Sequence, residues 1–243
     1  MGDLTPFVDA LIDAFHRRGT FQPEHGMPRS VEEAYAVHTA LMAVLGPIGG
    51  FKISQKADRP AVVAPIPESR CFGDGARVDV PARVGVELEV GFVVTAPVPA
   101  PDAPDFRAGL LAAVRPAPMI ELVASRLDGP HAEDPVVKLA DLQACEALVA
   151  GDMLADWDGA DFNRPEVTFR YDASEIAAGT GQVPGGSALA ALEATARIVA
   201  ARFGGLQPGQ RVITGSLTPL TFIRAGQAMT GEVAGLGGVS ARI

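Results

Sequence analysis

The segment 86–94, VELEVGFVV, constrains the fold of this chain more than any other feature, because it places two acids inside an apolar strand. Successive side chains of a strand point to opposite faces, so Glu87 and Glu89 share one face. The apolar run that follows is typical of a strand covered on both sides. Because carboxylates are rarely buried without a partner, the fold must bring a partner to these two acids.

The composition indicates one large domain, or one domain with a smaller appendage. The 243 residues are 48% hydrophobic and 20% charged, which provides a sizeable core. A formal net charge of −9 argues against nucleic acid or an anionic membrane as a partner. No apolar run approaches the roughly 18 residues of a membrane span. Cys71 and Cys145 are isolated, so we expect a reduced, cytoplasmic location.

Three segments carry helix signals. The first helix begins at 5–6, Thr-Pro, with an apolar stripe behind it. A capping box at 30–33, SVEE, opens a second helix that ends before a Gly-Pro pair. A third runs from Ser187 to Phe203.

From about Phe51 the pattern changes to short β-rich runs, GFKIS, VELEVGFVV, PMIELVAS, EALVAGDM and RVITGS, and the glycine-rich tail also predicts strands. We therefore predict an α+β fold in which an N-terminal helical subdomain, residues 1–65, precedes a mixed, mainly β catalytic domain, residues 66–243.

A third acid, Glu121, also lies in an apolar run, and Lys52 is a lone cation in a strand-like apolar setting. Three carboxylates in apolar surroundings are satisfied together by one hard cation, and oxygen-only ligation suits Mg²⁺ or Mn²⁺. The alternative is structural, with the first two acids on the solvent side of an edge strand and paired with Arg83 or Arg126.

The order of these motifs resembles the fumarylacetoacetate hydrolase superfamily. The motifs are GFKI, ELE in a hydrophobic strand, IELVASR, LAD and TGS. Within the superfamily the chain is most similar to the branch of 2-keto-4-pentenoate hydratases and 4-oxalocrotonate decarboxylases, which begins with an N-terminal helical segment. The resemblance runs from about residue 30 to the C-terminus and implies the superfamily's β roll.

The resemblance also implies roles for single residues. Glu87, Glu89 and Glu121 match the ligands of a Mg²⁺ or Mn²⁺ ion. Lys52 matches a catalytic lysine that faces the substrate, and Asp141 matches a catalytic acid.

Departures from the family pattern lie around the organic part of the substrate. Leu142 replaces an asparagine, Gln143 follows it, and Ser54 replaces a glycine, while 55–58 is a shortened loop. We expect Ser54 and Leu142 to bind substrate. An amide replaced by leucine favours a longer or more apolar 2-keto acid.

Four further residues have two interpretations each. Glu33 is a general acid or base, or only the capping-box glutamate. Arg126 binds substrate, or pairs with a structural acid. Thr214 and Ser216 offer hydroxyl groups to a substrate carboxylate, or belong to a tight turn.

The predicted function is a metal-dependent hydratase acting on a 2-hydroxy-2,4-dienoate or its 2-keto-4-enoate tautomer, as in the degradation of aromatic compounds. The alternatives are a 4-oxalocrotonate-type decarboxylase, an acylpyruvate C–C hydrolase that uses His25 or His131, and a catalytically silent partner subunit. We expect a homo-oligomer, and a complex with a related hydratase or decarboxylase is an open alternative.

Overall fold

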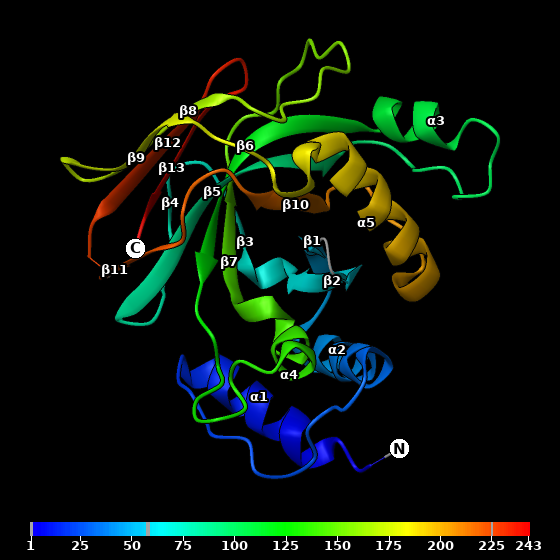
Figure 1. Ribbon diagram of the computed structural model, residues 1–243, viewed down its shortest axis with the longest axis vertical. Helices are drawn as coiled ribbons and strands as arrows, with labels where there is room; N and C mark the ends of the chain where they lie inside the picture. Colours follow the sequence, from blue (N-terminus) through cyan, green and yellow to red (C-terminus); the bar gives the residue numbers. More distant parts are fainter. Residues whose placement is uncertain (1, 57–58, 225) are drawn as a thin grey trace.

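The computed structural model describes residues 2–56, 59–224 and 226–243 (Figure 1). Its longer helices are α1 (Thr5–Arg17), α2 (Val31–Leu45) and α5 (Ala188–Phe203), which confirms the three predicted from sequence. Two short helices escaped prediction, α3 (Phe106–Ala112) and α4 (Pro135–Ala140), because six or seven residues are too few to show a helical period.

The larger sheet has eight strands within the described ranges, in the order β2-β1-β10-β5-β6-β7-β3, with β11 also paired to β5. The bounds are β1 (Ile48–Lys56), β2 (Arg59–Pro67), β3 (Cys71–Gly73), β5 (Arg83–Val94), β6 (Val114–Val123), β7 (Cys145–Ala150), β10 (Arg211–Ser216) and β11 (Thr221–Arg224). β5 lies near the centre and is buried over almost its whole length, as its continuous apolar run predicted.

A smaller sheet packs beside the larger one, in the order β4-β13-β12-β8-β9 (Figure 1). Its strands are β4 (Ala76–Arg77), β8 (Glu166–Tyr171), β9 (Ser174–Thr180), β12 (Ala228–Val233) and β13 (Gly237–Arg242). The glycine-rich tail therefore forms strands, as expected. The predicted α+β class is confirmed.

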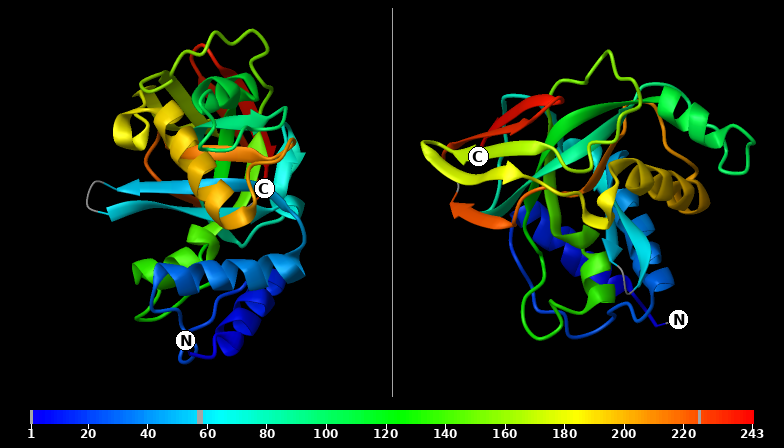
Figure 2. Two further views of the ribbon diagram at one scale, coloured as in Figure 1. Left: turned by 90° about the vertical axis from the view of Figure 1, so that its right-hand side faces the viewer. Right: turned by 45° about the horizontal axis from the view of Figure 1, so that its top comes forward.

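Helices α1, α2 and α4 gather at one end of the molecule, and α5 packs on β10, β1 and β2 (Figures 1 and 2). Phe7, Leu11 and Phe15 of α1 form the buried stripe that the sequence indicated. At the start of α2, Ser30 Oγ accepts the backbone N–H of Glu33.

The predicted domain boundary at residue 65 falls inside β2, and β1 and β2 both belong to the larger sheet. The division of the chain into a helical subdomain and a catalytic domain stays a prediction. Of the shortened loop 55–58, residues 57–58 lie outside the described residues. None of the helices in the described ranges is both long and apolar enough to cross a membrane.

Candidate active site

Three carboxylates converge on one face of the larger sheet. Glu87 of β5 lies directly opposite Glu121 of β6 in the antiparallel register, and Glu89 lies two residues further along β5. One oxygen from each of the three lies within 4.8 Å of the others. Glu89 and Glu121 are fully buried, at 1% and 0% exposure, so the edge-strand alternative does not describe this face.

Lys52 reaches this group from β1. Its Nζ donates to Glu121 Oε1 at 2.8 Å and to the carbonyl of Gln143 at 3.5 Å. Burial alone lowers the pKa of Lys52, but the negative charges of Glu121 and its neighbours outweigh burial and raise the pKa above the ordinary lysine value. Lys52 is therefore an ammonium at neutral pH.

One lysine does not neutralise three acids. Burial, with the neighbouring charge of Glu121, raises the pKa of Glu87 to about 7. The same causes raise the pKa of Glu89. Glu121 Oε2 is buried and has no hydrogen-bond partner in the described part of the chain. A divalent cation fits this oxygen-only donor set, since it would satisfy the orphaned oxygen and offset the repulsion.

A distortion of β10 supplies the donor for Glu89. The pairing of β10 with β5 shifts register between Ile213 and Ser216. At this shift Gly215 has φ +108° and its N–H donates to Glu89 Oε2 at 2.6 Å. A Cβ at Gly215 would lie 2.8 Å from a side-chain atom of Pro184, so only glycine fits.

The two hydroxyl residues beside Gly215 differ in their contacts. Thr214 Oγ1 donates to the carbonyl of Val90 at 2.8 Å, which is a structural bond inside the sheet. Ser216 Oγ donates to the carbonyl of Thr218 at 2.6 Å. A side-chain hydrogen bond from Ser216 also lowers the pKa of Glu87, against the larger effect of burial.

These groups line a cavity of about 1210 Å³. The predicted site residues along its wall are Lys52, Ser54, Glu87, Glu89, Thr214 and Ser216. Several other lining residues were not predicted from the sequence, including Glu32, Tyr35, Arg197 and Arg202. The sequence indicated only that these residues belong to predicted helices or strands. It did not indicate which helices would face each other across the cavity.

Leu142 is not where we expected it. Leu142, Gln143 and Ala144 all have positive φ, of 52°, 54° and 61°, and form a left-handed turn between α4 and β7. Non-glycine residues rarely adopt this conformation. The turn directs Gln143 to the cavity, while Leu142 is buried in the apolar cluster with α1 and α2. The structure therefore does not bring Leu142 to the cavity, where the sequence led us to expect it.

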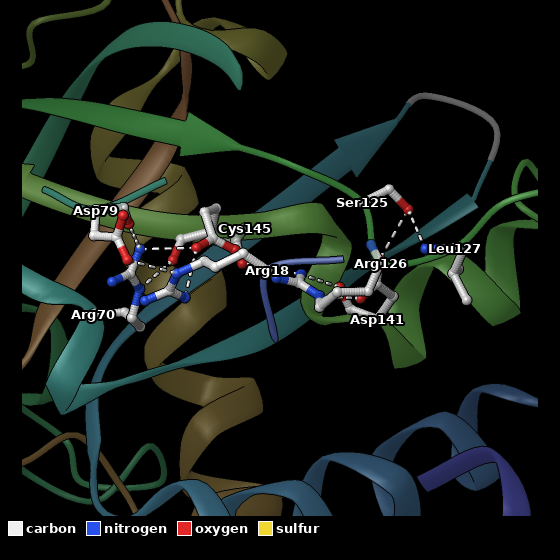
Figure 3. Close-up of polar contacts among 9 residues, drawn as sticks. Arg18, Arg70, Asp79, Ser125, Arg126, Leu127, Asp141 and Cys145 are labelled. Carbon is white, nitrogen blue, oxygen red and sulfur yellow. Dashed lines mark hydrogen bonds and ion pairs between the residues drawn. The ribbon is translucent and has the colours of Figure 1, made fainter. Parts of the chain in front are cut away.

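Arg126 and Asp141 also lie away from the cavity lining, in a buried ionic network (Figure 3). Asp141 accepts the Arg126 Nε–H at 2.5 Å, the Arg126 backbone N–H and the Ser125 hydroxyl. Glu146 of β7 accepts from Arg126 at 3.1 Å and from Arg70 at 2.8 Å. Arg126 therefore pairs with a buried acid, and the structure does not bring Arg126 or Asp141 to the cavity of the three carboxylates.

Glu33 follows its structural alternative too. Its Oε2 accepts the backbone N–H of Arg29 at 2.7 Å, the residue before the capping Ser30, and so binds the chain that leads into α2. Glu33, His25 and His131 line a separate pocket of about 510 Å³ and not the cavity of the three carboxylates.

Comparison with solved structures identifies the fold. 4-Oxalocrotonate decarboxylase from Pseudomonas putida G7, complexed with magnesium and adipate, superposes with a TM-score of 0.78 at 20% identity. The match covers 98% of this chain and 96% of that one. The chain has the fold of the fumarylacetoacetate hydrolase superfamily. The resemblance inferred from the motifs is confirmed at the level of the fold.

Other structures share the superfamily fold over less of the chain. The 5-carboxymethyl-2-hydroxymuconate delta-isomerase of Mycobacterium smegmatis has a TM-score of 0.58 at 16% identity, over 81% of this chain and 79% of that one. Fumarylpyruvate hydrolase from Pseudomonas aeruginosa, in complex with Mn²⁺ and pyruvate, has a TM-score of 0.56 at 13% identity, over 79% and 87%. No family model matches the sequence, and the curated proteins gave no significant match.

Proposed function

We propose that this chain is a divalent-metal-dependent lyase that acts on a 2-hydroxy-2,4-dienoate or its 2-keto-4-enoate tautomer, and that it hydrates this substrate. The observation that carries the proposal is the convergence of Glu87, Glu89 and Glu121 beside Lys52. Of these four residues, Lys52, Glu87 and Glu89 line a large cavity. The named structures of the same fold that hold Mg²⁺ or Mn²⁺ support a cation of this kind.

Glu87, Glu89 and Glu121 would hold the cation, which would supply Lewis-acid polarisation of a bound 2-keto acid. Lys52, which contacts Glu121 and lines the cavity, would add a positive charge beside the bound anion and exchange a proton with the substrate. The N–H of Gly215 holds Glu89 in position. Because Lys52 is already tied to Glu121, its ammonium is oriented before substrate arrives.

Hydration is placed ahead of decarboxylation because of the charges along the cavity. A 4-oxalocrotonate-type substrate carries a second carboxylate that needs a cation. Of the described lining residues, the cations other than Lys52 are Lys138, Arg197 and Arg202, and each pairs with an acid. A substrate with one carboxylate therefore fits this charge distribution better.

Decarboxylation is the second candidate, favoured by the TM-score of 0.78 to 4-oxalocrotonate decarboxylase. The hydrolase alternative is weaker, because no histidine is found among the described residues that line the cavity.

The test is a panel of 2-hydroxydienoates and acylpyruvates with Mg²⁺ and Mn²⁺. A hydratase removes the ultraviolet absorbance of the conjugated dienoate and yields a 4-hydroxy-2-keto acid, seen by NMR, without releasing CO₂. Release of CO₂ from a 2-keto-enedioate selects the decarboxylase, and pyruvate from an acylpyruvate selects the hydrolase. Metal binding without turnover of any compound selects the silent subunit, and absence of metal binding overturns the proposal.

A further inference from the structure

The cavity is larger than the reacting part of the proposed substrate requires. Pockets for drug-sized ligands occupy roughly 300–1,000 Å³. This cavity encloses about 1210 Å³, and the carboxylates with Lys52 occupy only part of its wall. A five-carbon dienoate would leave most of this space unfilled.

The remaining wall is mostly apolar and comes from four elements that are distant in sequence. Helices α2 and α4, strand β2 and helix α5 contribute Tyr35, Val136, Leu139, Val62, Ile198 and Ala201. Tyr35 and Leu139 are buried, and Val62, Val136 and Ile198 are half-buried. Apolar surface that lines a cavity gains free energy when a ligand displaces water from it.

The cations along this wall are already neutralised. Arg202 forms a bidentate ion pair with Glu32. Its Cζ lies 4.7 Å from the centroid of the Tyr35 ring. Arg197 Nη2 lies 2.9 Å from Glu193 Oε1.

Lys138 Nζ lies 2.7 Å from Glu133 Oε2. A second carboxylate on the substrate would have to share one of these cations with the acid already paired to it, whereas an apolar tail needs no cation.

We propose that the preferred substrate is a 2-keto acid with a single carboxylate and a long alkyl or aryl tail, and that this tail lies along the wall formed by α2, α4, β2 and α5. The inference rests on the proposed function, because the head of the acid binds at the carboxylates and Lys52. The wall formed by Val62, Ile198 and Ala201 sets the chain-length preference.

Calorimetry of binding in the presence of Mg²⁺ tests the tail without requiring turnover. The ligands are pyruvate, 2-oxohexanoate, 2-oxodecanoate and the dicarboxylate 2-oxoadipate. Each methylene that leaves water improves affinity by about threefold to fourfold. We expect 2-oxodecanoate to bind at least tenfold more tightly than 2-oxohexanoate, and 2-oxoadipate to bind more weakly than 2-oxohexanoate.

Two outcomes overturn different claims. If none of the four acids binds with Mg²⁺ present, the proposed function fails. If pyruvate binds but affinity does not increase with chain length, the proposed preference for an apolar tail is wrong while the proposed function stands. The same holds if 2-oxoadipate binds more tightly than 2-oxodecanoate.

A matched pair of variants locates the tail. Ile198→Glu places a carboxylate in the part of the wall that α5 contributes. It should lower the affinity for 2-oxodecanoate at least tenfold more than it lowers the affinity for pyruvate. Val44→Glu introduces the same charge on α2, at a residue that is 56% exposed and does not line the cavity. It should leave both affinities unchanged. Equal effects of Ile198→Glu on both ligands would place the tail elsewhere.

Discussion

Glu87 and Glu121 lie directly opposite each other in the antiparallel pairing of β5 and β6. Like charges at directly opposed positions of a sheet are destabilising, and burial adds to the cost. Lys52 offsets part of that cost through its 2.8 Å contact with Glu121. A divalent cation held by these carboxylates, as proposed above, would offset the rest of that cost.

We expect Mg²⁺ to raise the melting temperature of the protein, because the cation binds the folded chain and not the unfolded one. Glu89→Gln should raise the melting temperature of the metal-free protein, since it removes one buried charge from the group, and should abolish most of the increase caused by Mg²⁺. Glu175→Gln, an exposed change on β9, is the control. Thermal unfolding with and without Mg²⁺ checks this prediction. An unchanged Mg²⁺ effect in Glu89→Gln would contradict it.

Lys52→Met should leave the fold intact and lower kcat by about two or more powers of ten, in the range of lost acid–base catalysis. It should also tighten Mg²⁺ binding, because a positive charge beside the three carboxylates is removed. Steady-state kinetics and calorimetry measure the two effects. Lys138→Met is the control, since Lys138 lines the same cavity but pairs with the exposed Glu133. A near-normal kcat in Lys52→Met would make Lys52 structural.

Stability should fall on mild acidification because of His38. Burial lowers the pKa of His38 to about 4, although its bond to the Leu139 carbonyl acts in the opposite direction. The unfolded chain therefore takes up a proton first as pH falls below about 6.5, and the folded chain only near pH 4. The free energy of unfolding should decrease by up to about 3 kcal/mol between these values, and His38 should contribute no slope above pH 6.5.

Urea unfolding at pH 7, 5.5 and 4.5 measures that decrease, and His38→Gln provides the comparison. The glutamine amide can still donate to the Leu139 carbonyl but does not titrate. The variant should lose less stability than the native chain over the same interval. Parallel slopes for the two proteins would assign the acid sensitivity to other groups.

Asp141→Asn should destabilise the protein strongly, by about 3 kcal/mol, because it removes one of the two buried carboxylates that pair with Arg126 and leaves only Glu146. Asp13→Asn breaks the exposed pair with Arg17 and should cost less than about 1 kcal/mol. Denaturant unfolding compares the two. In the folded fraction KM should stay unchanged for Asp141→Asn, since Asp141 does not line the cavity. A stable variant with a raised KM would return Asp141 to the substrate site.

The elements that local chemistry controls were predictable from the amino-acid sequence. The capping serine of α2, the N-terminal proline of α1 and the continuous apolar run of β5 act within a few residues of themselves. For the same reason the shared face of Glu87 and Glu89 was predictable, because strand alternation is local.

The contacts that those residues make with distant parts of the chain depend on tertiary packing. The opposition of Glu87 and Glu121 depends on strand register, and the pairing of Arg126 with Asp141 depends on a loop and a turn that sequence periodicity does not describe. The burial of Leu142 follows from three consecutive residues in a left-handed conformation that their side chains do not favour. The cavity is lined by both α2 and α5. Glu32 of α2 and Arg202 of α5 pair although they are 170 positions apart in the sequence. Such contacts form only when the whole chain packs, because burial and close approach, not local propensity, select them.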